Sequence, residues 1–168
     1  SENLYLWMLR FGDTLCVDSV DSTIGINANS GDIKWKIPRT EQHWLCSSVA
    51  DGAFFIQDDH TLRRFDGTTG SLLSAERLVV PKATLDCVRN GRLYFGQSAI
   101  GGLVTLSPVI YSINLGGKSP LWLKRYNFDT KGVHVIDVWR NCVLVLFEME
   151  GAAMFTLDGV EVWRKKVS

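Results

Sequence analysis

The sequence has no excess of charge and no long hydrophobic run. Lys and Arg together number 18, Asp and Glu also number 18, and the formal net charge is zero. This balance gives no electrostatic footprint for a nucleic acid, so we expect no DNA or RNA partner. The longest apolar runs, such as 53–56 and 142–147, are far shorter than the ~20 residues needed to cross a bilayer. We therefore expect no membrane partner.

Cysteine is scarce and irregularly spaced. The four cysteines, Cys16, Cys46, Cys87 and Cys142, form no CxxC pair and lack the density of a disulfide-stapled domain. Reduced, buried thiols are the simpler interpretation, although two disulfides in any of three pairings stay open. No Asn-x-Ser/Thr sequon occurs, and the start Ser1-Glu2-Asn3 lacks a basic leader, as in a fragment of a longer chain. We expect a cytoplasmic location, with a secreted or luminal one not excluded.

Catalytic signatures are also missing. The sequence contains no GxSxG, no HExxH and no phosphate-binding GxxxxGK[ST]. His43, His60 and His134 are far apart in sequence and have no partner at metal-ligand spacing. The sequence therefore predicts no catalytic residue, no cofactor and no metal.

What the sequence does contain is an internal repeat of about 40 residues. Trp35, Trp122 and Trp163, together with Ser74, mark one position in four copies, with steps of 39, 48 and 41. A Gly stands four residues before this position in three copies, as Gly31, Gly70 and Gly159, and Lys118 replaces it in the third. The repeats span about 4–37, 44–77, 83–125 and 133–166 of one domain or part-domain, 1–168.

Each repeat carries a short turn between two apolar runs. Gly12-Asp13, Asp51-Gly52, Asn90-Gly91 and the more degenerate Arg140-Asn141 stand at these turns, and Asp-Gly or Asn-Gly between strand-like segments indicates a hairpin with a type I′ turn. The runs that follow are continuously apolar, which is typical of strands buried on both faces. In the second repeat the four expected strands are 44–50, 53–57, 61–65 and 71–77. Four strands per unit of about 40 residues predict an all-β fold, a β-propeller of about four blades with four antiparallel strands each.

These motifs carry a family resemblance. Gly25-x-Asn27-x-x-x-Gly31-x-x-x-Trp35 resembles the tryptophan-docking motif of quinoprotein-like (PQQ-like, WD40-like) propellers, and parts of it recur at Asp66 and Gly70, at Ser112, Asn114 and Trp122, and at Ala153, Gly159 and Trp163. The resemblance implies that Trp35, Trp122 and Trp163 dock between blades, with Gly31, Gly70 and Gly159 in tight turns. Propellers of this kind usually close with seven or eight blades. The chain would then be a half-ring or fragment, completed by further blades or a second copy, unless it closes as a small ring.

The function predicted from these features is a non-catalytic protein–protein interaction or scaffolding module. An alternative is a sensor or assembly domain that dimerises through an exposed blade, and a third is a fragment of a PQQ-dependent dehydrogenase. Arginine beside aromatic residues is typical of interaction hot spots, and the longer third repeat indicates a binding loop. The predicted partner-binding residues are Arg39, Trp44, Arg125, Phe128, Gln97 and Ile100. Acidic residues at Asp18, Asp21, Asp58, Asp59, Glu148 and Glu150 are interpreted as a solvated rim, with a cation or partner site as the alternative.

Overall fold

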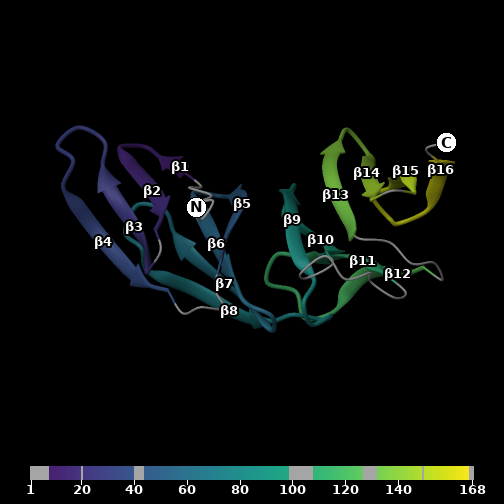
Figure 1. The fold of residues 1–168 in the computed structure, drawn as a ribbon, viewed down its shortest axis with the longest axis horizontal. Helices are drawn as coiled ribbons and strands as arrows, with labels where there is room; N and C mark the ends of the chain where they lie inside the picture. Colours follow the sequence, from purple (N-terminus) through teal and green to yellow (C-terminus); the bar gives the residue numbers. More distant parts are fainter. Residues whose placement is uncertain are drawn as a thin grey trace, which may run out of the picture. The chain divides into compact units, whose positions relative to one another are not determined.

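A computed structural model describes residues 8–19, 21–39, 44–98, 108–126, 132–148 and 150–166. Within these residues every regular element is a β-strand, and sixteen strands are present (Figure 1). The chain divides into two compact units, Ser1–Arg77 and Leu78–Ser168. Each unit contains two four-stranded blades.

The first unit holds the first and second blades. Each is an antiparallel meander in which consecutive strands pair, in the order β1-β2-β3-β4 and β5-β6-β7-β8. The strands of the first blade are β1 (Met8–Phe11), β2 (Thr14–Asp18), β3 (Ser22–Asn27) and β4 (Ile33–Pro38). Those of the second blade are β5 (Trp44–Ala50), β6 (Ala53–Gln57), β7 (Thr61–Asp66) and β8 (Leu72–Arg77).

The second unit holds the third and fourth blades. The third comprises β9 (Thr84–Arg89), β10 (Arg92–Ser98), β11 (Val109–Asn114) and β12 (Pro120–Arg125). The fourth comprises β13 (Gly132–Trp139), β14 (Cys142–Phe147), β15 (Gly151–Thr156) and β16 (Glu161–Lys166). Strand β10 also pairs with β13, through Gln97 with Val133 and Ser98 with Gly132, which joins these two blades into one eight-stranded sheet.

The predicted fold class is confirmed. The strands of the second blade lie within a residue of the ranges expected from the sequence. The strand after each hairpin turn is well buried, most fully in β6, where all five residues are buried. In β2 and β14, by contrast, buried residues alternate with more exposed ones, so these two apolar runs are not covered equally on both faces.

The four hairpin turns are of two kinds. Asp51-Gly52 and Asn90-Gly91 have positive φ at both central residues, as a type I′ turn requires. In the other two turns only the first central residue, Gly12 or Arg140, has positive φ, which is the pattern of type II′. Type I′ turns thus occur where the sequence has Asp-Gly and Asn-Gly, as predicted.

The turn between the last two strands explains why Asn or Asp recurs there. Asn27 Oδ1 accepts hydrogen bonds from the backbone N–H groups of Asn29 and Ser30, at 2.9 and 3.4 Å. Asp66 Oδ1 does the same for Thr68 and Thr69. These side chains hold a local turn with their own backbone, which is the property that favours Asn and Asp in turns.

The fourth blade departs from this pattern. Its final turn is one residue shorter, and Thr156 stands in place of Asn or Asp, accepting a hydrogen bond from Val160 N–H at 3.1 Å. Trp163 consequently lies opposite Met154, whereas Trp35 lies opposite Gly25 and Trp122 opposite Ser112. The alignment of Ala153 with the first residue of the motif is therefore wrong by one position, because fixed spacing from the tryptophan ignores the shortened turn.

Candidate functional site

Within the first unit, Trp35 joins two blades. Its ring stacks on Phe54 of the second blade, with 5.4 Å between ring centroids and 8° between planes. The indole Nε1–H donates to the carbonyl of Thr68 at 3.1 Å. The ring also covers Gly70, where a Cβ would lie 2.6 Å from the indole, so a side chain there would displace the tryptophan. The core of this unit gathers around the same contact.

Within the second unit, Trp122 makes the same connection. Its Nε1–H donates to the carbonyl of Leu157 at 2.8 Å, and its ring stacks on Phe155 at 6.5 Å and covers Gly159. Both acceptor carbonyls stand two residues before the covered glycine. A docking pair in this protein is therefore a tryptophan on the last strand of one blade and a glycine turn in the following blade.

The outer blades each hold half of such a pair. Trp163 occupies the docking position of the fourth blade and is 36% exposed. Gly31 occupies the turn position of the first blade, and among the described residues nothing lies within 4 Å of where its Cβ would be. Of the six residues predicted to hold blades together, Trp35, Gly70, Trp122 and Gly159 form two complete docking pairs, whereas Trp163 and Gly31 are docked against no described residue.

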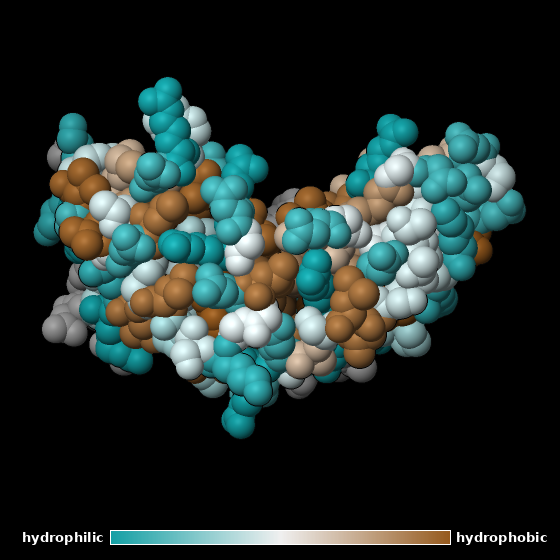
Figure 2. Space-filling model, turned by 180° about the vertical axis from the view of Figure 1, so that it is seen from behind, coloured by the Kyte–Doolittle hydropathy of each residue, from teal (hydrophilic) through white to brown (hydrophobic). Residues whose placement is uncertain are grey.

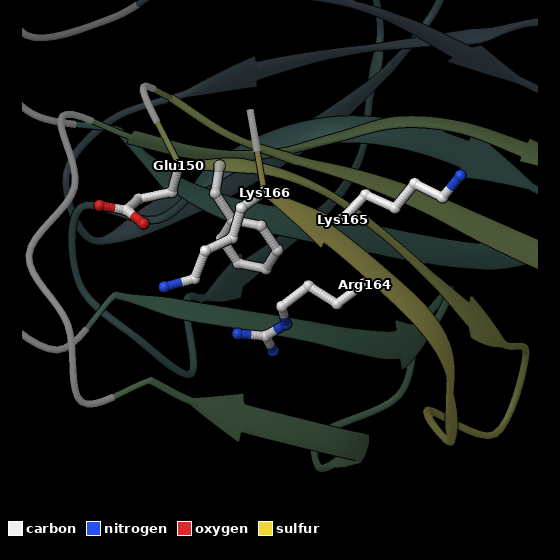
Figure 3. A pocket seen from close by; sticks show the side chains of 5 residues that line it. Glu150, Arg164, Lys165 and Lys166 are labelled. Carbon is white, nitrogen blue, oxygen red and sulfur yellow. The ribbon is translucent and has the colours of Figure 1, made fainter. Parts of the chain in front are cut away.

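A shallow pocket of about 160 Å³ opens on the edge of the fourth blade. Its lining residues are Phe147, Glu150, Arg164, Lys165 and Lys166. Figure 3 shows the ends of Arg164 and Lys166 on one side of β16, while Lys165 points away on the other side. This alternation follows from the pleat of a strand, in which successive side chains face opposite ways.

Aromatic rings fix the arginine of this pocket. The Arg164 guanidinium lies 5.1 Å from the ring centre of Phe147 and 4.9 Å from that of Tyr126. It also donates a hydrogen bond to Glu161 at 2.8 Å. Contacts of this kind between a cation and aromatic faces are attractive and restrict the side chain. The pocket thus combines a held guanidinium, a lysine and an apolar floor.

A second polar cluster surrounds His134. Its Nε2 lies 3.2 Å from Glu148 Oε1, and its Nδ1 lies 3.6 Å from Asp86 Oδ1. Asp86 also accepts the backbone N–H of Val135 at 2.7 Å, which ties β9 to β13. Burial raises the pKa of Asp86, while the hydrogen bond that His134 donates to the Asp86 carboxylate raises the pKa of His134 above its ordinary value. His134 thus contacts two carboxylates, and the spacing of residues in the sequence gave no signal for its partner Asp86.

The predicted partner-binding residues have varied placements. Arg39 donates to Asp18 at 2.9 Å and to the carbonyl of Ser19, so its guanidinium joins the ends of the first blade. Arg125 is exposed at the end of β12, and Gln97 is half-buried in β10, opposite Val133. Phe128, Ile100 and the side chain of Trp44 lie outside the described residues, as does most of the expected binding loop of the third repeat.

The acidic residues behave largely as structural partners. Asp18, Asp21 and Asp58 each form an ion pair within their own blade, with Arg39, Lys36 and Arg63. Asp58 also accepts the backbone N–H groups of His60 and Thr61. Across the described ranges no group of three His, Cys, Asp or Glu residues could hold a metal ion.

The sequence contained a signal for the pocket, but a comparison of spacings between repeats does not reveal it. Arg164 and Lys166 alternate along an outer strand and therefore share one face. Tyr126 directly follows Arg125, within the Arg-aromatic segment 124–128 that was predicted to bind a partner. The structure thus finds the arginine–aromatic combination close to the expected segment, with the arginine supplied by a different blade.

No protein-family model matches this sequence, and no curated protein matches it either. Solved structures do match. BamB from Moraxella catarrhalis is 14% identical, with a TM-score of 0.53, over 95% of this chain and 60% of that one. Quinohemoprotein alcohol dehydrogenase ADHIIG from Pseudomonas putida is 11% identical, with a TM-score of 0.64, over 95% and 34%. The Pan2 WD40 domain from Neurospora crassa is 11% identical, with a TM-score of 0.63, over 90% and 48%.

These likenesses confirm the resemblance to quinoprotein-like and WD40-like propellers at the level of the fold. The chain spans between about a third and three fifths of the solved chains that it matches. Identity this low shows the fold alone, so the likeness to an alcohol dehydrogenase gives no support to the third functional hypothesis. Among the described residues there is also no helix long and apolar enough to span a membrane.

Proposed function

We propose that this chain is a non-catalytic protein–protein interaction or scaffolding module of the quinoprotein-like propeller type. The observation that carries the proposal is the pocket of the fourth blade, where Arg164 lies against two adjoining aromatic rings beside Lys166. Arginine and aromatic residues are enriched where protein interfaces concentrate their binding energy. The fold supports the same kind of function, because propellers present many loops and strand edges to partners.

The chemistry of the pocket selects an acidic side chain of the partner. Three cationic residues line it against one carboxylate, Glu150. A guanidinium can bind a carboxylate through two parallel hydrogen bonds, and the aromatic contacts reduce the rotamer freedom that Arg164 loses on binding. The Phe147 ring supplies an apolar floor for the methylene groups of a glutamate. We therefore propose a protein partner that inserts a glutamate or aspartate here.

The test uses a charge reversal with a control on the same strand. A fluorescent glutamate-rich peptide should bind the wild-type chain, and Lys166→Glu should weaken that binding roughly tenfold, as for loss of a desolvated charge contact. Lys165→Glu changes net charge equally, but the side chain of Lys165 extends on the other side of β16 from Arg164 and Lys166, so this variant should have a much smaller effect. Fluorescence anisotropy at several salt concentrations measures both.

Two results would contradict the proposal. One is a failure of every acidic peptide to bind, and the other is an equal loss in the two variants, which would show attraction by net charge alone. An RNA homopolymer serves as a second probe. Tighter binding of RNA than of the glutamate-rich peptide would show that the partner is a nucleic acid rather than a protein.

A second candidate function is assembly through an exposed blade. The observation that favours it is the exposure of Trp163, since the equivalent residues Trp35 and Trp122 are docked on a following blade. Apolar surface of this kind usually marks an interaction site. Figure 2 shows apolar side chains at the surface interleaved with hydrophilic ones.

We also propose a cytoplasmic location. All four cysteines are free thiols, and two of them, Cys16 and Cys46, are buried. Such thiols suit a reducing compartment, where structural disulfides are rare.

A further inference from the structure

The last strand of each blade lies at the edge of its sheet. These outer strands are β4, β8, β12 and β16, and each pairs with one described strand only, the strand before it. The backbone N–H and C=O groups on the outward side of such a strand can pair with a strand of another chain. The four outer strands can therefore be compared as binding edges, and they differ in charge.

The first three outer strands have few cations, and most of these are engaged or balanced by a neighbouring group. In β4, Lys34 and Lys36 form ion pairs with aspartates of their own blade, at 3.0 and 3.4 Å. In β12 the Lys124 ammonium lies over an aromatic ring of the next blade. In β8 both signs of charge stand side by side, at Glu76 and Arg77. None of these strands presents an unbroken row of unpaired cations.

Strand β16 is different, because it ends in three consecutive cations, Arg164, Lys165 and Lys166. Among the described residues, no carboxylate lies within ion-pair distance of Lys165 or Lys166. Like charges directly opposite each other destabilise a pair of strands, and opposite charges stabilise it. The row therefore opposes pairing of β16 with the same strand of a second copy and favours pairing with an acidic strand.

The end of β16 has the regular geometry that an added strand needs. Residues 163–166 lie opposite 151–154 of β15 one by one, beyond a register shift at Met154 and Phe155. Figure 3 shows Arg164 and Lys166 on one side of β16. This side packs toward the end of the third blade, since the Arg164 guanidinium lies over the Tyr126 ring. Both blades belong to the second unit, so the edge and the pocket form one described surface.

The spacing of the two cations on this side selects an extended partner. Arg164 and Lys166 are two residues apart, which is about 6.6 Å along a strand. In an extended segment residues i and i+2 also point to one side, so two carboxylates at this spacing reach both cations together. On a helix, residues i and i+2 do not face the same way.

We propose that a partner protein adds an extended acidic segment to the edge of β16, as a fifth strand of the fourth blade. Its backbone pairs with 163–166, and two carboxylates at positions i and i+2 lie against Arg164 and Lys166. The proposal rests on the proposed function, to which it adds the conformation of the partner and the spacing of its acidic residues.

Fluorescence anisotropy of labelled peptides with the purified chain tests the spacing. The probe is Thr-Val-Glu-Val-Glu-Val-Thr, and the control, Thr-Val-Glu-Glu-Val-Val-Thr, has the same composition with adjacent glutamates. The control should bind roughly tenfold more weakly, because only one of its carboxylates points to the side of Arg164 and Lys166. Equal affinity for the two peptides would overturn the proposal.

Methylation of single backbone nitrogens in the probe tests strand pairing. Alternate N–H groups of a strand point to the same edge, so the central valine and the glutamate after it point their N–H groups to opposite edges. N-methylation of one of these two residues should weaken binding roughly tenfold or more, and N-methylation of the other should change it little. Amide hydrogen exchange of the chain should slow in β16 on binding and stay unchanged in β8, the matched outer strand without a row of cations.

The outcomes separate this proposal from the one on which it rests. Binding that is weakened by Lys166→Glu but by neither N-methylation would mean recognition by side chains alone. That result would overturn strand addition and leave the proposed function standing, as would exchange that slows equally in β8 and β16. If no acidic peptide binds the chain, the proposed function fails, and strand addition fails with it.

Discussion

The docking pair of the first unit predicts a large and local loss of stability in Trp35→Ala. A fully buried tryptophan costs about 3–5 kcal/mol when truncated to alanine. Trp35 is only half-buried, so we expect about 2–3 kcal/mol, including about 1 kcal/mol for the hydrogen bond to Thr68. Trp35→Phe keeps a ring over Phe54 and Gly70 and loses the indole N–H, so it should cost about 1 kcal/mol.

Trp163→Ala is the matched comparison, because it makes the same change at the same position of another blade. Trp163 is exposed and is docked against no described blade, so its replacement should change the stability of the monomer by less than about 0.5 kcal/mol. The measurements belong at concentrations where the chain is monomeric. Under those conditions the two substitutions differ in the presence of a following blade under the indole and in the residue opposite the tryptophan, Gly25 for Trp35 and Met154 for Trp163.

Native-state hydrogen exchange is followed at individual amides, so it can assign a loss of stability to one of the two compact units. Trp35→Ala should speed the exchange of amides in β6 and β7 and leave those in β14 and β15 unchanged. Urea unfolding should show a midpoint lowered by about 1 M or more for the first unit. The docking argument is refuted if Trp163→Ala destabilises the monomer as much as Trp35→Ala, or if β6 exchange is unaffected by loss of Trp35.

Two further predictions concern titratable groups. The folded pKa of His134 lies above its ordinary value of 6.5, so the stability it contributes is complete below pH 6.5 and is lost as the pH rises through the folded pKa. Unfolding measured from pH 6 upward should show the second unit weakening, and His134→Gln should flatten that part of the profile; a pH dependence identical in both proteins would contradict the role of Asp86 and Glu148. Burial, with a smaller contribution from Asp18, raises the pKa of Cys16 to about 12. Cys16 should therefore resist alkylation at pH 8 in the native chain and react on unfolding, as mass spectrometry would detect; rapid native labelling would show that the thiol is accessible.

The sequence predicted the blades well because their signals are local. A turn residue, an apolar strand and a recurring tryptophan each reflect a constraint within about 40 residues. Asn27 and Asp66 illustrate this, since their side chains organise turns that begin at the same residue. The shortened turn before Trp163 was missed because spacing cannot show which residue lies opposite which; only the pairing of Trp163 with Met154 reveals it.

The pocket and the histidine cluster could not be predicted in the same way. Arg164 meets Tyr126 across 38 positions of sequence, and His134 meets Asp86 across 48. Both separations are close to one repeat length, but the repeat does not tell which residues of neighbouring blades come into contact. Contacts of this kind depend on how blades pack within a unit, and the same residue types elsewhere in the chain, such as Arg39 with Asp18, serve only to hold one blade together.

The irregular repeats follow a pattern when the docking residues are considered as pairs, each made of a tryptophan and a glycine in the following repeat. Trp35 has its partner Gly70, and Trp122 has its partner Gly159. In the second blade Ser74 replaces the tryptophan, and in the next repeat Lys118 replaces the glycine that would receive it. The two halves of this pair are therefore missing together. Each internal pair is thus either complete or wholly absent. Trp163 and Gly31 are the two halves that have no docking partner among the described residues, so each is available for a contact of the same kind.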